Sequence, residues 1–120
     1  MVGGGMRQIG IVAAAGLYAL RNNIDRLDDD HTNAKRLADG LSALDGIAVD
    51  LDTVESNMVF IKPAKGTGDA LRRHLAASNI VTGSYDEQGD ASLRLVTHLD
   101  IDSDDIDKVV EAFAAFADHR

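Results

Sequence analysis

Apolar residues recur at helical spacing through the first third of the chain. Between residues 6 and 44 they follow one another in steps of three, four or seven, and no proline interrupts them. This period places them on one face of a helix. The pattern predicts either one very long helix or two collinear helices with a bend near Asn22, longer than the usual mean of about 11–12 residues.

The rest of the chain alternates short apolar runs with turn residues. We expect a turn at 85–90, a helix over 68–78, a last helix starting at Asp102, and strands at 47–49, 57–61, 80–82 and 93–97. Strands and helices do not alternate strictly in this order. The sequence therefore predicts an α+β fold, in which a long N-terminal helix precedes a small, mostly antiparallel sheet (β-β-α-β-β-α) with helices on one face.

The segment 9–20 has almost no polar face. A helix that is apolar all round is normally buried all round. A small sheet with two short helices can cover only one side of it. We therefore expect the other side to contact a partner surface that this chain lacks.

The net charge of the chain argues against two classes of function. The chain carries 20 acidic and 12 basic residues, a formal net charge of −8. This surplus argues against a nucleic-acid-binding protein and against binding to an anionic membrane surface. The excess of Asp over Glu fits either a GC-rich genome or adaptation to high salt. The run 9–20 is too short to cross a bilayer, no secretory signal is recognisable, and cysteine is absent, so we expect a cytoplasmic protein.

The start of the chain carries residue types suited to anion binding. Glycines 3–5 precede a predicted helix start, where free backbone amides and the helix dipole favour an anion. Arg7 could add a charge-assisted contact to phosphate or carboxylate. The same residues also fit a flexible terminus or a tight packing turn.

A second candidate lies on the predicted strand 93–97. Alternation places Arg94, Val96 and His98 on one face. An arginine in an apolar strand is costly to bury unless an anion or an acid meets it, although an edge-strand arginine in water or a salt bridge also fits. We expect His98 to be a structural hydrogen bonder, the run 28–31 to be a solvated face, and no metal site. The remaining histidines are expected at the surface: His31, His74 and His119.

Four stretches together resemble the C-terminal part of the low-specificity L-threonine aldolases: GGGMRQIGIVAAAGLYAL, RLDDDHTNAKRLADGL, VDLDTVESNMVFI and LRLVTHLDI. The resemblance covers nearly the whole chain. It implies a pyridoxal 5'-phosphate (PLP) lyase of the aspartate-aminotransferase-like fold type I, which cleaves L-threonine or L-allo-threonine to glycine and acetaldehyde by retro-aldol chemistry. It also implies that residues 1–45 are a connecting helix segment and residues 46–120 are the C-terminal small domain.

The resemblance further implies roles for individual residues. Arg94 would bind the α-carboxylate of a small amino-acid substrate. Arg7, with Gly4 and Gly5, would bind the cofactor phosphate, reached from a neighbouring subunit of a dimer or tetramer. Members carry the Schiff-base lysine upstream, in a large domain, and this chain's lysines do not stand in that motif: Lys35, Lys62, Lys65 and Lys108.

The chain by itself is therefore expected to hold no catalytic residue, to be inactive and not to bind the cofactor. Two alternatives stay open. One is a non-catalytic α+β module that binds an anion or a protein. The other is a different fold type I PLP lyase or an aminotransferase, because a fold does not define a reaction.

Overall fold

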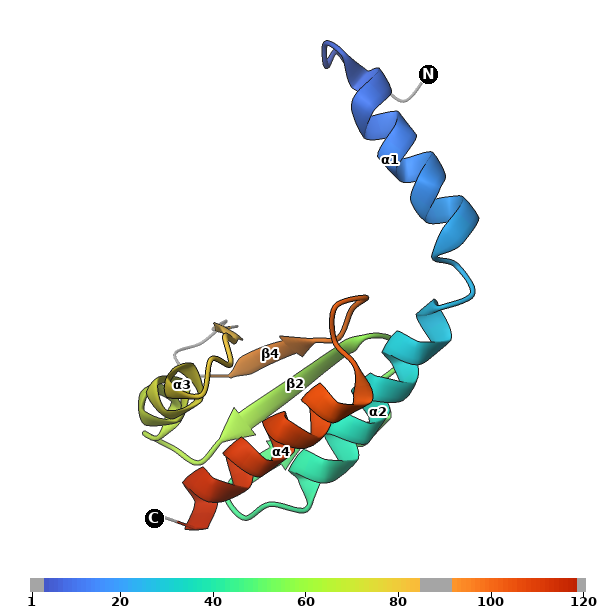
Figure 1. Ribbon diagram of the computed structural model, residues 1–120. Helices are drawn as coiled ribbons and strands as arrows, with labels where there is room; N and C mark the ends of the chain where they lie inside the picture. Colours follow the sequence, from blue (N-terminus) through green and yellow to red (C-terminus); the bar gives the residue numbers. More distant parts are fainter. Residues whose placement is uncertain (1–3, 85–91, 119–120) are drawn as a thin grey trace.

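The computed structural model describes residues 4–84 and 92–118 (Figure 1). The turn expected at 85–90 lies outside these residues. In chain order the elements are α1 (Ile9–Asn22), α2 (Leu27–Ser42), β1 (Ile47–Val49), the short 3-10 helix η1 (Leu51–Thr53), β2 (Met58–Pro63), α3 (Gly68–Ala77), β3 (Gly83–Ser84), β4 (Leu93–Val96) and α4 (Ser103–Asp118).

The helical pattern over residues 6–44 forms two helices. The side-chain amide of Asn22 donates to the carbonyl of Tyr18 at 2.7 Å, and the Asn23 N–H donates to the carbonyl of Ala19 at 2.8 Å. Asparagine side chains compete with the backbone in this way and favour a helix end. Figure 1 shows the chain turning between α1 and α2, so the predicted bend near Asn22 is confirmed and the predicted collinear arrangement is wrong.

Helix α1 stands apart from the rest of the molecule (Figure 1). None of its 14 residues is buried, and the side chain of Ile11 is 78% exposed. We expected the sheet to cover one side of this helix, which is wrong for this chain, because the turn at 23–26 directs α1 away from the sheet. Helix α1 therefore presents apolar surface on all sides.

The four strands form one antiparallel sheet in the order β1-β2-β4-β3. The strand predicted at 80–82 is wrong, since β3 comprises only Gly83 and Ser84. The preceding residues close α3 instead: Asn79 is left-handed with φ 59°, and the Ile80 N–H donates to the carbonyl of Leu75 at 2.9 Å. The chain therefore reaches β4 only at Gly83.

One face of the sheet packs against helices. Residues alternate between buried and exposed along β2 and β4, and helices α2 and α4 cover the buried face in Figure 1. This arrangement confirms the predicted α+β class with helices on one face. The largest fully buried apolar side chains are Phe113, Leu41, Ile61, Leu71, Leu75, Leu93, Ile106 and Val59.

A small polar cluster ties the end of β4 to α2. The Thr97 hydroxyl donates to the carbonyl of Asp30 at 2.7 Å, and the Asn57 side-chain amide donates to the carbonyl of Thr97 at 2.7 Å. The Asp30 carboxylate accepts hydrogen bonds from Nη1 and Nη2 of Arg26, and this contact raises the pKa of Arg26. Asp30 is 4% exposed, so the expectation that residues 28–31 form a solvated face is wrong for Asp30.

Candidate functional site

Arg94 lies on an interior strand of the sheet. β4 has β2 on one side and β3 on the other, so the edge-strand alternative for this arginine is wrong. Its neighbours Leu93 and Leu95 point into the core, whereas Arg94 is exposed on the face that no helix covers. Within residues 4–84 and 92–118, no carboxylate forms an ion pair with its guanidinium. Its planar set of donors has the geometry that suits a carboxylate.

The surroundings of Arg94 on this open face are mostly apolar. Antiparallel pairing puts Phe60 directly across from Arg94 and Met58 across from Val96. These three apolar side chains are each between 37% and 42% exposed. Sequence reasoning missed Phe60 as a neighbour of Arg94, because register between strands more than thirty residues apart is not visible in local patterns.

The other predicted anion ligands lie at the free end of α1. Arg7, Gly4 and Gly5 are exposed, and a Cβ added at either glycine would meet no atom within 4 Å. Gln8 caps the helix in a left-handed conformation, φ 49°, and no described side chain caps the first N–H groups of α1. Such a helix start is open to an anion.

Arg7 and Arg94 are not brought together in this chain. Helix α1, about 21 Å long for its 14 residues, separates Arg7 from the turn at 23–26. Figure 1 shows this end of the chain far from β4. The two arginines therefore do not bind one small molecule within the same copy of this structure.

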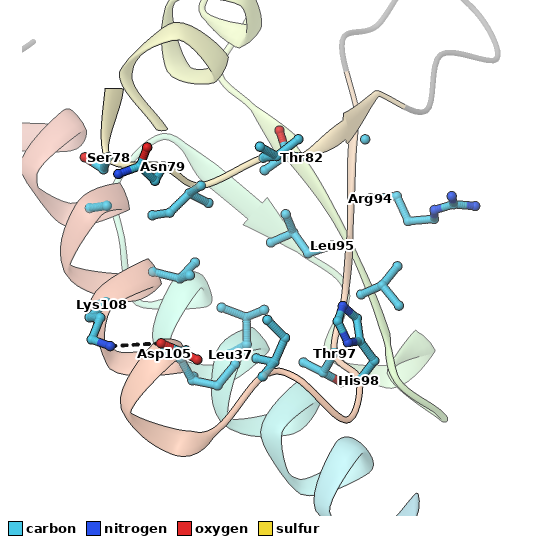
Figure 2. A pocket seen from close by; sticks show the side chains of 18 of the residues that line it. Leu37, Ser78, Asn79, Thr82, Arg94, Leu95, Thr97, His98, Asp105 and Lys108 are labelled. Carbon is cyan, nitrogen blue, oxygen red and sulfur yellow. Dashed lines mark hydrogen bonds and ion pairs between the residues drawn. The ribbon is translucent and has the colours of Figure 1, made fainter. Parts of the chain in front are cut away.

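A hollow lies beside Arg94, on the side of the sheet away from its guanidinium. A cavity of about 910 Å³ opens between the segment 78–83, β4 and α4. Arg94 is on its rim, but Figure 2 shows its side chain pointing away from the hollow. Two charged residues of the cavity lining, Lys108 and Asp105, form an ion pair at 2.9 Å, and this hydrogen bond raises the pKa of Lys108. The cavity therefore borders the backbone of Arg94, while its guanidinium lies outside the hollow.

Two of the described histidines, His98 and His74, lie within hydrogen-bonding distance of backbone groups, and His31, expected at the surface, is partly exposed. His98 accepts the Asp100 N–H at 3.3 Å through Nδ1, a contact of the kind that its predicted structural role requires. His74 was expected at the surface, but its Nε2 lies 3.0 Å from the carbonyl of Ala112, and its ring centroid lies 5.5 Å from that of Phe116. His119 lies outside the described residues. In the part of the chain that the structure describes, no three His, Cys, Asp or Glu side chains are grouped to hold a metal ion.

Solved enzymes share this fold. A NifS-like protein matches 98% of this chain and 36% of its own chain, with a TM-score of 0.77 and 16% identity. The cystine C–S lyase C-DES, solved with its reaction product cysteine persulfide, matches 88% of this chain and 28% of its own, with a TM-score of 0.70 and 18% identity. The fold of this chain thus occurs as part of larger solved proteins. The model of the beta-eliminating lyase family matches residues 1–64, more than half of the chain, and the chain belongs to this family.

Curated relatives are more similar in sequence. The low specificity L-threonine aldolase of Escherichia coli K12 is 39% identical over 116 residues, which are 97% of this chain and 32% of the relative. Low-specificity L-threonine aldolase 1 of Arabidopsis thaliana is also 39% identical, over 93% of this chain and 31% of the relative. The chain spans about a third of the length of these relatives. The resemblance to low-specificity L-threonine aldolases is confirmed.

Among the described helices, none combines the length and the apolar character needed to cross a membrane.

Proposed function

We propose that this chain is the substrate-carboxylate-binding part of a PLP-dependent L-threonine aldolase. The intact enzyme would cleave L-threonine or L-allo-threonine to glycine and acetaldehyde. The similarity to threonine aldolases over 97% of the chain is the observation that carries this proposal. Arg94, which is exposed on the open face of the sheet and forms no ion pair with a described carboxylate, supports it, because an amino-acid substrate offers a carboxylate.

Arg94 holds the α-carboxylate of the substrate in this proposal. A guanidinium binds a carboxylate through two parallel N–H···O bonds and so defines its orientation as well as its position. Orientation matters here, because the Cα–Cβ bond that breaks must stand across the plane of the cofactor ring. Hydrogen bonds from Thr97 to α2 and from Asn57 to Thr97 hold the end of the strand that carries Arg94.

The residues at the start of α1 fit the phosphate of PLP. Arg7 offers a positive charge, Gly4 and Gly5 leave room for close approach, and the helix start lacks a described cap. The cofactor, when bound, acts as the electron sink for cleavage of the Cα–Cβ bond. Arg7 and Arg94 would serve different copies of the site, as in a homo-oligomer in which α1 reaches a neighbouring subunit.

The exposed apolar surfaces support a larger assembly. Helix α1 and the open face of the sheet would contact the large domain that the rest of the relatives' length supplies, and a second subunit. In this proposal residues 1–45 connect the domains and residues 46–120 form the small domain of a cytoplasmic enzyme. The chain alone would be inactive and would not hold PLP, since none of its lysines stands in the Schiff-base motif.

Kinetics of the intact gene product test the proposal. We expect acetaldehyde and glycine from L-threonine, and we expect Arg94→Ala to raise KM for L-threonine by about 10- to 100-fold, with a smaller fall in kcat, because two charge-assisted hydrogen bonds are lost. The matched control is Arg72→Ala, an exposed arginine of α3 whose ion pair with Asp69 is long, at 3.7 Å. Its kinetics should equal those of the unaltered protein.

The outcomes separate the proposal from its rivals. Wild-type kinetics in Arg94→Ala would remove Arg94 from the site. An intact product that converts other amino acids but not threonine would point to another fold type I lyase or an aminotransferase. Acetaldehyde released by the 120-residue chain alone would contradict its expected inactivity.

A further inference from the structure

Gly83 is the cross-strand neighbour of Arg94 on the side away from Phe60. The register pairs Gly83 with Arg94 on β3 and β4, and Phe60 with Arg94 on β2 and β4. Residues directly opposite each other in an antiparallel pair point to the same face of the sheet. Arg94 therefore has an aromatic side chain on one flank and, on the other, a position without a side chain.

The open flank belongs to the outermost strand. β3 ends the described sheet, whose order is β1-β2-β4-β3, and Gly83 is exposed. Figure 2 shows the Arg94 side chain pointing away from the cavity beneath the sheet, toward the uncovered face. At the position directly opposite Arg94 on β3, a small molecule on that face meets no side chain, because this position is Gly83.

The backbone does not require glycine at this position. The left-handed glycines of the described chain are Gly46 and Gly66, and Gly83 is not among them. A Cβ built on Gly83 would meet the Arg94 carbonyl oxygen at 3.6 Å, an ordinary contact. Glycine destabilises a β-strand, whereas β-branched residues stabilise the strand conformation. A glycine in a strand often marks a bulge, a tight bend or a place where a ligand approaches the backbone closely, and the exposed guanidinium of Arg94 beside Gly83 favours the last of these.

We propose that Gly83 forms a notch beside Arg94 that admits the α-carboxylate of the amino-acid substrate, and that it is a specificity-determining position. This inference rests on the proposed role of Arg94. Phe60 blocks the approach from β2, so the carboxylate enters from the β3 side. A side chain at position 83 would occupy the place of the carboxylate and leave the catalytic machinery of the rest of the enzyme unchanged.

The test compares Gly83→Val and Gly83→Ala with the unaltered intact gene product. Gly83→Val should raise KM for L-threonine roughly 10-fold by displacing at least one charge-assisted hydrogen bond, and Gly83→Ala should raise it by a smaller factor. The kcat and the thermal midpoint should stay close to the original values, because valine suits an outer strand. Thr82→Val is the matched control: it places the same side chain one position earlier, outside the register that pairs Gly83 with Arg94.

Binding gives a readout that does not need activity. Glycine, titrated into the intact gene product, should shift the Arg94 Nε–H resonance, and Gly83→Val should weaken that binding roughly 10-fold. Should valine at position 83 prevent folding, Gly83→Ala carries the test with the 3.6 Å contact found here.

The two proposals fail in different ways. Unchanged KM and glycine binding in both Gly83 variants, while Arg94→Ala weakens them, would overturn the notch and leave the role of Arg94 standing. If Arg94→Ala has no effect, or the intact product does not cleave threonine, the proposed function fails. A lack of effect of Arg94→Ala would overturn the notch as well, whereas a product that binds glycine through Arg94 without cleaving threonine would leave the titration to decide whether position 83 controls access to Arg94.

Discussion

Replacing Gly40 with alanine tests how closely α2 and α4 approach each other. A Cβ built on Gly40 would lie 2.8 Å from Cγ2 and 3.2 Å from Cγ1 of Val110 on α4. Carbon atoms pack best at about 3.5–4.0 Å, so the nearer contact is short by roughly 1 Å. Valine has one strongly preferred rotamer in a helix, so Val110 cannot swing aside at low cost. The helices must move apart, or the valine must take an unfavourable rotamer.

Two opposing effects determine the size of the change. Overpacking a helix interface costs about 1–3 kcal/mol of the free energy of unfolding. Alanine is about 1 kcal/mol better than glycine in a helix interior. The repulsion exceeds this gain, so we expect Gly40→Ala to lower the free energy of unfolding by about 1 kcal/mol. For a domain of this size the thermal midpoint then falls by about 4 °C.

Urea unfolding followed by circular dichroism measures the change, and a double-mutant cycle identifies its cause. Val110→Ala removes both crowded methyl groups, so Gly40→Ala should become neutral or stabilising in that background, with a coupling of about 1 kcal/mol or more. Gly16→Ala on α1, where a Cβ meets no atom within 4 Å, is the control that should cause no loss. If Gly40→Ala leaves the free energy of unfolding unchanged and shows no coupling to Val110→Ala, the close approach of α2 and α4 is refuted.

Two further predictions concern the same folded unit. Phe113 is fully buried in the core, so Phe113→Ala should lower the free energy of unfolding by about 3–5 kcal/mol in urea titration, and a change within error would contradict the packing described. Hydrogen bonds from Lys108 and from the Asp102 N–H lower the pKa of Asp105 below 3.8. Ionised Asp105 therefore stabilises the fold above this pH and loses that effect as the pH falls through its folded-state pKa. The urea midpoint should drop between about pH 7 and about pH 3, and this drop should be smaller in Asp105→Asn than in the original protein. An equal drop in both proteins would count against the contact.

Local patterns were sufficient for most of the elements. Alternation along 93–97 predicted that Arg94 and Leu95 face opposite sides, and the burial along β4 confirms it. The acidic start of α4 behaves as expected at a helix N-terminus, with the Asp105 N–H donating to the Asp102 carboxylate at 2.9 Å. These predictions succeeded because each depends on residues within a few positions of one another.

Two of the predictions, the strand at 80–82 and the solvated position of Asp30, failed because neighbouring elements use these residues for their own hydrogen bonds and packing. The β-branched run at 80–82 has strand propensity, yet the end of α3 takes up Asn79 and Ile80 for its own closing hydrogen bonds. Asp30 belongs to an acidic run typical of a solvated surface. The packing of α2 against the sheet buries its carboxylate, and Arg26 one turn earlier compensates the charge.

The sequence by itself determined the α+β class and the apolar character of α1, and it singled out Arg94 as a candidate anion ligand, because hydrophobic period and residue chemistry are local properties. Only the tertiary structure decided that β4 lies inside the sheet, that Phe60 and Gly83 flank Arg94, and that α1 projects free of the fold. Strand order and register join residues that are distant in the chain. They follow from how the helices and the sheet pack together, which no window of sequence contains.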